Sequence, residues 1–189
     1  RVFVAGAAVA VALGEDVSKE ALGGWQIQAR HGTVDDVVET EADAFAAARQ
    51  FLSYLPPSVD YLPERTPPTD DPGRREDALI SIVPTDGVTP YKPRRIIDAC
   101  VDAGSFFEIG RQWGRGIVTG LARIDGYPVA ILAGDPFFLD GAWTADVCDK
   151  VSRHMDLATL FHLPVVHFVD CPGFAVGVKH ESAGVTRRG

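Results

Sequence analysis

The spacing of apolar residues predicts a helix that runs from residue 41 to residue 55. Its start, Thr40-Glu41-Ala42-Asp43, resembles a capping box in which Asp43 takes the place of the preferred Glu. The positions that would share its apolar face are Phe45, Ala48, Leu52 and Leu55. Two consecutive prolines, Pro56 and Pro57, cannot continue a helix, so we expect it to end there.

Two further helices follow from the same periodicity. The first should begin at Pro93, a favourable first-turn residue, and end at Gly104 in a left-handed cap. Its apolar stripe would consist of Ile96, Ile97, Cys100 and Val101. The second should lie within residues 143–161, with Val147, Val151, Met155 and Ala158 on one side.

Strands are predicted on either side of the last helix. Residues 117–124 and 128–133 would form a hairpin around Asp125-Gly126, a strong turn signal. Residues 163–169 make a continuous apolar run, which is typical of a strand buried on both faces. The order strand, strand, helix, strand indicates a layered α/β domain with right-handed crossovers.

Proline divides the chain into two parts. Nine of the 13 prolines fall between Pro56 and Pro93, and the polar stretch at the start of this region has no periodicity. Such composition is typical of an extended linker, so we place a boundary over residues 56–90. The apolar start of the chain has a single basic residue and no cleavage-site pattern, so we interpret it as the interior of a longer protein.

Bulk composition then excludes several classes of protein. The formal net charge of −8 argues against nucleic acid as a main partner, because phosphate binding needs a basic face. No apolar run approaches the ~20 residues that span a bilayer, so no membrane association is expected. The three cysteines are dispersed and form no C-x-x-C pair, which favours a reducing, cytoplasmic location without disulfides.

The usual catalytic side chains form no clear constellation. His154, His162, His167 and Asp170 lack metal-ligand spacing, and His167 is more easily interpreted as a satisfied core histidine, so no metal is expected. Cys171 follows a predicted strand, as the nucleophile of a G-x-S-x-G elbow does. However, the first glycine of the elbow is missing and the next residue is Pro172, which has no N–H. A small buried cysteine is therefore the favoured interpretation.

Two loops of small residues remain as candidate binding elements. Gly134-Asp135-Pro136-Phe137 follows the second hairpin strand, and Gly173-Phe174 follows the last strand. Ligands bind beyond the carboxyl ends of strands in open α/β sheets, although each loop could equally be a tight turn without a ligand. One or two arginines of a larger set would meet a phosphate, the others being solvated: Arg94, Arg95, Arg111, Arg115, Arg123, Arg187 and Arg188.

Several segments, in order, resemble the carboxyltransferase family that includes the β subunits of propionyl-CoA and acetyl-CoA carboxylases and glutaconyl-CoA decarboxylase. The resemblance covers nearly the whole chain outside the linker. It rests on Leu13 to Val17, Ala21 to Gly24, Phe51 to Pro56, Tyr91 to Ile97, Ser105 to Ile109, Ile117 to Gly126, and Leu163 to Phe174 with Gly177, Glu181, Gly184 and Arg187 to Gly189.

The resemblance implies the crotonase-like (ClpP/crotonase) α/β fold, built from ββα units and present here in part. Residues 1–55 would end the N-terminal carboxyltransferase subdomain, residues 56–90 would link the two subdomains, and residues 91–189 would begin the C-terminal one. It also implies an oligomer of carboxyltransferase subunits that works with a biotin carboxylase and biotin carrier subunit.

The implied activity moves CO2 from carboxybiotin to the α-carbon of a short acyl-CoA, so biotin and coenzyme A are the expected cofactor and substrate carrier. In this family, pairs of main-chain N–H groups stabilise the oxyanions, each donor contributing on the order of 3 kcal/mol. The resemblance puts those glycine pairs outside the 189 residues, so no catalytic residue is named here and the fragment alone is expected to be inactive. Gly134, Asp135, Pro136, Phe137, Gly173 and Phe174 would retain part of the coenzyme A and biotin surroundings.

Other functions remain open. A biotin-dependent decarboxylase would run the reaction toward CO2 release, and a non-catalytic fragment would serve as an assembly surface. An ordinary crotonase hydratase would need paired catalytic carboxylates, and none is placed convincingly. The bulky Phe137, Phe138 and Trp143 favour a small or unusual acyl group.

Overall fold

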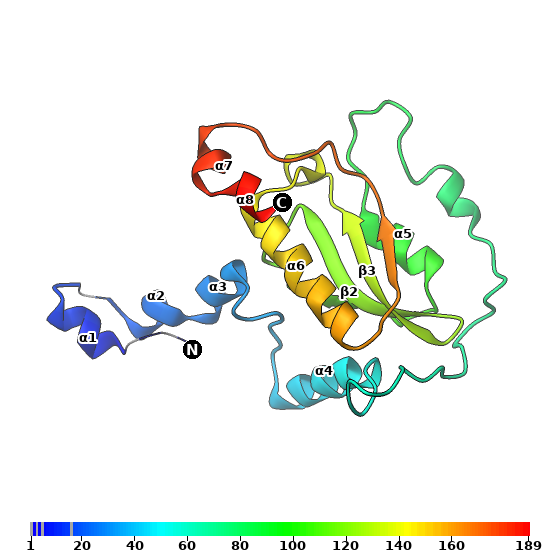
Figure 1. Cartoon of the computed structure of the whole chain (residues 1–189), viewed down its shortest axis with the longest axis horizontal. Helices are drawn as coiled ribbons and strands as arrows, with labels where there is room; N and C mark the ends of the chain where they lie inside the picture. Colours follow the sequence, from blue (N-terminus) through cyan, green and yellow to red (C-terminus); the bar gives the residue numbers. More distant parts are fainter. Residues whose placement is uncertain (1, 3, 5, 16) are drawn as a thin grey trace.

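A four-stranded sheet forms the centre of the protein in the computed structural model, which describes residues 2, 4, 6–15 and 17–189 (Figure 1). The strands lie in the order β1 (Phe107–Ile109), β2 (Ile117–Ile124), β3 (Tyr127–Gly134) and β4 (Val165–Phe168). The first three are antiparallel, and β4 runs parallel to β3. The predicted order of strand, strand, helix, strand is confirmed; only the short β1 was missed. Arg1 and Asp16, which the sequence patterns include, lie outside the described residues.

The predicted hairpin is confirmed, because its turn has the backbone shape that Asp-Gly favours. Asp125 and Gly126 both have positive φ angles, 50° and 77°, as a two-residue type I′ turn requires. The Asp102 carboxylate accepts hydrogen bonds from both turn N–H groups, at 2.8 and 2.7 Å. The turn is therefore fixed from outside the hairpin as well as by its own residues.

Helices cover both faces of the sheet, which makes three layers (Figure 1). Helix α5 (Pro93–Cys100) contributes Ile97 to a cluster with Val118 and Ile131, and α6 (Ala145–Leu160) contributes Val147 to a cluster with Ile117 and Leu132. Successive strand residues point to opposite faces, so β2 and β3 are buried on both sides. The predicted apolar side of the last helix is confirmed.

The end of α5 differs from the prediction. The helix stops at Cys100, four residues before Gly104, because Val101 already has an extended backbone. The N–H of Asp102 then bonds the carbonyl of Arg123 at 2.8 Å, which ties this end of the helix to β2. Gly104 has a φ of 72° in the following turn rather than in a helix cap. A tertiary contact, not the local pattern, ends the helix.

The predicted capping box is confirmed at the start of α4 (Glu41–Ser53), but the predicted apolar face is not the buried one. Phe45 and Leu52 are 55% and 62% exposed. Phe51 and the buried Tyr54 instead pack beside Phe107 of β1, with ring centroids 6.3 and 6.5 Å from that of Phe107. The helix thus contacts the sheet through its last turn and the residue that follows it.

Strand β4 is shorter and more exposed than predicted. It occupies four residues at the edge of the sheet in the described part of the chain, and its exposure alternates because Val166 and Phe168 pack on the cluster that contains Ile97 while the opposite face is exposed. Val165 is 38% exposed and Val169, just beyond the strand, is 74% exposed. The interpretation of His167 as a core histidine is wrong, since this residue is exposed; the buried histidine is His154 of α6, at 4% exposure.

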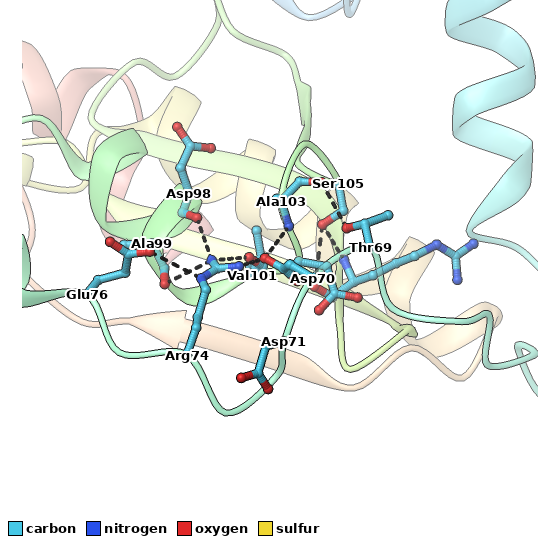
Figure 2. A network of polar contacts seen from close by, with 12 residues as sticks. Thr69, Asp70, Asp71, Arg74, Glu76, Asp98, Ala99, Val101, Ala103 and Ser105 are labelled. Carbon is cyan, nitrogen blue, oxygen red and sulfur yellow. Dashed lines mark hydrogen bonds and ion pairs between the residues drawn. The ribbon is translucent and has the colours of Figure 1, made fainter.

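The proline-rich segment is extended, and it is also docked onto the far end of the hairpin. Residues 56–90 are all described, and their one regular element is a short 3-10 helix, Asp77–Ile80. The N–H of Thr66 bonds the carbonyl of Gly126 at 3.1 Å. Figure 2 shows Arg74 reaching carbonyls at the end of α5: those of Asp98, Ala99 and Val101, at 3.0, 3.1 and 2.7 Å.

Short helices complete the two ends of the chain. Before α4 come α1 (Ala7–Ala12), α2 (Lys19–Gly23), α3 (Trp25–Gln28) and a 3-10 turn, Ala29–His31; α1 and α2 project away from the sheet (Figure 1). After β4 come α7 (Val178–Ser182) and α8 (Val185–Arg188), and a 3-10 turn, Leu139–Gly141, precedes α6. Within the described residues, no helix combines the length and apolar character needed to cross a bilayer.

Candidate functional site

The candidate site is where β3 and β4 end, because parallel strands deliver their carboxyl ends to the same edge of a sheet. The loop after β3 carries Gly134, Asp135, Pro136 and Phe137, and the loop after β4 carries Gly173 and Phe174. The loops touch at Gly134, where an added Cβ would lie 2.0 Å from the carbonyl oxygen of Asp170. The structure therefore brings the two predicted loops together.

Hydrogen bonds fix the second loop to the residue that leads into α6. The N–H of Trp143 donates to the carbonyl of Gly173, and the N–H of Ala175 donates to the carbonyl of Trp143, both at 2.9 Å. The Trp143 and Phe174 rings meet edge to face, with centroids 6.2 Å apart. Trp143 thus contacts Phe174 through both its backbone and its ring and holds the second loop against the start of α6.

The first loop is held by a buried carboxylate. Asp135 is 1% exposed, and its own N–H donates to the carbonyl of Gly116 at 2.9 Å. One carboxylate oxygen accepts from the N–H of Phe137 at 3.2 Å, and the other accepts from Arg94 Nη1 at 2.8 Å. A buried charge needs such partners, so Asp135 is fixed in place and shapes the loop around it.

Further along, the same loop contains strained backbone. Leu139 and Asp140 have φ angles of 50° and 52°, in the left-handed region that side chains other than glycine rarely adopt. Each such residue costs roughly 1–2 kcal/mol, so the surrounding structure must impose the conformation. Strain of this kind is typical of functional loops, which supports a role for this one.

The second loop leaves main-chain donors without acceptors. Among the described residues, no hydrogen-bond acceptor faces the N–H groups of Phe174, Val176 or Gly177. Gly173 has a φ of 123°, and a Cβ added there would meet nothing within 4 Å. The loop therefore offers small residues and free amide donors to anything that approaches it.

Two hollows lie on either side of the first loop. The larger, about 830 Å³, is lined by Arg30, Gln112, Gly114, Arg115, Gly116, Phe137, Phe138, Leu139, Ala142, Thr144 and Asp146. The smaller, about 390 Å³, is lined by Lys92, Pro93, Arg94, Arg95, Arg111, Asp135, Phe137 and Phe138. Phe137 and Phe138 border both, and Arg115 lies 3.8 Å from the centre of the Phe138 ring. A third hollow, about 410 Å³, lies beside Arg74 at the opposite end of the hairpin.

Arginines of the predicted phosphate-binding set separate into two groups. Arg94 already has acidic partners: it donates to both oxygens of Glu108, at 2.8 and 2.5 Å, and to Asp135. These contacts, with the hydrogen bond to Glu108 as the largest cause, raise the pKa of Arg94 above its usual value. Arg95 and Arg111 line the smaller hollow, and Arg95 has no ion pair in the described residues. Arg94 is therefore already engaged by protein carboxylates, and Arg95 remains a candidate for an anionic group.

Tyr91 is a site residue that the sequence did not single out. Its hydroxyl donates to Asp170 Oδ2 at 2.5 Å, which holds the start of the second loop. Burial, and then the hydrogen bond and negative charge of Asp170, raise the pKa of the Tyr91 phenol well above its usual value. The phenol therefore stays protonated and keeps donating at ordinary pH. Tyr91 belongs to the Tyr91 to Ile97 segment of the family resemblance, which was the available signal for it.

The candidates for side-chain chemistry do not assemble into a centre. No group of three or more His, Cys, Asp or Glu residues suited to a metal ion occurs in the part of the chain that the structure describes. Cys171 is half-buried rather than buried, and its sulfur accepts from the N–H of Gly173 at 3.3 Å. The prominent polar features of the site are therefore main-chain groups and the carboxylates that position them.

Layered ββα architecture with loops at the strand ends is the arrangement that the resemblance to crotonase-like carboxyltransferases implies. Among known proteins, a family model for the carboxyl transferase domain matches residues 1–189. The chain belongs to this carboxyl transferase family. The relationship covers its whole length and includes both loops of the candidate site.

Named relatives are consistent with the family. The chain is 37% identical, over 93% of its length, to the biotin-dependent long chain acyl-coenzyme A carboxylase beta4 subunit of Mycobacterium tuberculosis, of which it covers 34%. It is 34% identical, over its full length, to the methylmalonyl-CoA decarboxylase subunit alpha of Veillonella parvula, of which it covers 38%. The chain therefore spans about a third of the curated relatives it matches.

Solved structures agree on the fold. The crystal structure of transcarboxylase 12S, a hexamer with hydrolysed methylmalonyl-coenzyme A bound, superimposes with a TM-score of 0.93 at 31% identity, covering 98% of this chain and 36% of that one. A single-chain, multi-domain long-chain acyl-CoA carboxylase gives a TM-score of 0.81 at 33% identity, covering 99% of this chain and 18% of that one. The expected crotonase-like fold is thus confirmed.

Proposed function

We propose that this chain is part of the carboxyltransferase component of a biotin-dependent acyl-CoA carboxylase, which moves CO2 from carboxybiotin to the α-carbon of a short acyl-CoA. The observation that carries the proposal is the pairing of two main-chain loops at the ends of β3 and β4, in a chain of this family. A reaction that develops oxyanions suits an edge that presents main-chain N–H donors.

The residues present fit a flat, uncharged ring system and a thioester at this edge. Phe137 and Phe174, each 51% exposed, offer apolar surface, and Gly173 leaves open space for close approach. The free N–H groups of Phe174 and Gly177 suit an amide- or urea-type carbonyl oxygen. Biotin, when bound, supplies the carried carboxyl group; the two loops would orient its ring and limit access of water.

Assembly with other polypeptides is part of the proposal. Transfer from biotin requires a carrier that is loaded by a biotin carboxylase, so we expect such a subunit as partner. We also expect a homo-oligomer of carboxyltransferase subunits, because the transcarboxylase 12S neighbour forms a hexamer. The family's oxyanion glycines are expected in segments that correspond to the parts of the relatives outside the third that this chain covers, so the 189 residues alone should not catalyse transfer.

Carboxyl transfer in the full-length protein tests the proposal. The protein is mixed with a biotinylated carrier domain that has been loaded with [14C]carboxyl by a biotin carboxylase, and propionyl-CoA is added as acceptor. Radioactivity should move to the acyl-CoA, and omission of the biotinylated carrier should abolish the transfer. Equal acyl-CoA turnover with an unbiotinylated carrier would contradict the proposal.

A decarboxylase is the second candidate, favoured by the 34% identity to the methylmalonyl-CoA decarboxylase subunit over the full chain. The two candidates differ in the direction that the assembled system supports. With [14C]methylmalonyl-CoA and biotinylated carrier, a decarboxylase system releases labelled CO2 as its net product. A carboxylase system instead consumes ATP and bicarbonate to make the carboxylated acyl-CoA.

A further inference from the structure

Both loops of the candidate site are tied to one short segment at the start of α5. Tyr91 lies two residues before the helix and bonds Asp170, next to the second loop, at 2.5 Å. Arg94 lies in the first turn of the helix and bonds Asp135, in the first loop, at 2.8 Å. The two side chains are three residues apart, so a single turn of backbone connects both loops.

Arg94 is itself held rigidly, which makes it suitable as an anchor. Its guanidinium donates to both oxygens of Glu108 on β1, in a fork geometry that a lysine cannot reproduce. The remaining Nη1 reaches the buried Asp135, whose other oxygen accepts from the N–H of Phe137. A continuous chain of charge-assisted contacts therefore runs from β1 through α5 to the backbone of the first loop.

Tyr91 provides the corresponding contact for the second loop. Asp170 directly precedes Cys171 and lies three residues before Gly173. Its carbonyl oxygen is the atom that Gly134 approaches. A phenol donating to a carboxylate is a strong, directional contact. It fixes Asp170, and with it the point where the two loops touch.

We propose that Tyr91 and Arg94 are positioning residues that set the relative placement of the two loops for carboxyl transfer. This inference rests on the proposed function, because it names what aligns that same site. Neither side chain needs to touch the reacting atoms. Rates of group transfer are sensitive to placement, and a displacement of ~1 Å can lower them by ~100-fold.

Kinetics of the full-length protein test the inference with conservative variants. Tyr91→Phe removes one hydroxyl, and Arg94→Lys keeps the charge but loses the fork. Each should lower kcat for carboxyl transfer by about 10-fold or more, while KM for the acyl-CoA changes less than about threefold, because a lost alignment acts mainly on the transition state. Matched controls are Tyr61→Phe and Arg49→Lys, both at exposed positions outside the site.

Double variants separate positioning from general damage. Arg94→Met leaves the Asp135 carboxylate buried and unpaired, whereas Arg94→Met with Asp135→Asn removes the charge as well. The double variant should unfold at a higher urea concentration than Arg94→Met, yet its kcat should stay low because the tether is still missing. Recovery of kcat together with stability would show a purely structural role and overturn the inference, as would wild-type kcat in both conservative variants.

Amide exchange keeps the inference testable even if carboxyl transfer itself is absent. The N–H of Phe137 is protected by Asp135, so its hydrogen exchange should be at least about 10-fold faster in Arg94→Met than in the wild type. Unchanged exchange at Phe137 would refute the tether without reference to activity. Absent transfer with faster exchange would instead remove the proposed function and keep the tether.

Discussion

The close approach of the two loops makes a specific prediction at Gly134. A methyl group added there would lie 2.0 Å from the carbonyl oxygen of Asp170 and 3.0 Å from its carbonyl carbon. Ordinary contacts between such atoms are about 3.5 Å, so the loops would have to separate by more than 1 Å. Gly134 is held by its pairing with Ile117 in the β2–β3 ladder, and Asp170 follows the end of β4 by only two residues, so neither side can move away freely.

The expected cost of Gly134→Ala follows from this geometry. Overpacking costs about 1–3 kcal/mol, and the rigid surroundings favour the upper end. Replacing glycine by alanine also stabilises by ~0.4–1 kcal/mol through the unfolded state. The net loss should be about 2 kcal/mol in the free energy of unfolding.

Thermal and urea unfolding of the full-length protein measure the effect. Gly6→Ala is the matched control, because a Cβ there would meet nothing within 4 Å and its φ is −64°. The control should differ from wild type by less than ~0.5 kcal/mol, as surface substitutions usually do. Equal stability of Gly134→Ala and the control would refute the close approach of β3 and β4 loops.

Four other substitutions test separate parts of the structure. Thr40→Ala removes the side-chain half of the capping box and should cost ~1 kcal/mol in urea unfolding, whereas Ser18→Ala at the shorter α2 should cost less. Burial, and then the charge of Lys150, lower the pKa of His154 from 6.5 to about 4. The folded protein resists protonation of His154, so the contribution of this residue to the free energy of unfolding should be fully present above pH 6.5. That contribution should fall by about 3 kcal/mol as the pH drops toward 4, and His154→Phe should lack this loss. Burial lowers the pKa of Lys150 from 10.5 to about 8, so wild-type stability should rise between pH 8 and 10.5 relative to Lys150→Met. A pH-independent difference between wild type and either variant would contradict the assigned burial.

Local pattern predicted the elements that local interactions define. The hairpin from Ile117 to Gly134 was found nearly to the residue, because two mainly apolar runs and the Asp-Gly turn between them are all encoded within the segment. The start of α4 was found because its cap is built from Thr40 and Asp43 alone. These features depend on neighbours in sequence, which a single sequence displays directly.

Features that depend on distant residues were missed or misplaced. Strand β1 has three residues and owes its existence to pairing with β2. A hydrogen bond between the N–H of Asp102 and the carbonyl of Arg123 sets the end of α5. The exposure of the β4 side chains depends on which distant elements pack against that strand. The rule that ligands bind beyond the carboxyl ends of strands located both loops of the site. The hydrogen bond from Tyr91 to Asp170, however, joins residues 79 positions apart, and no spacing rule indicates it.

The loops after β3 and β4 border the proposed acyl-CoA and biotin site, so ligand-dependent amide exchange should locate the bound ligands at these two loops. The full-length protein is exchanged in D2O with and without a saturating acyl-CoA and biotinylated carrier. Peptides that contain residues 134–142 and 171–177 should exchange more slowly with both ligands, since Phe174 and Gly177 carry amides without acceptors in the described residues. Protection confined to other segments, with exchange in both loops unchanged, would show that the ligands bind elsewhere and would refute this location of the site.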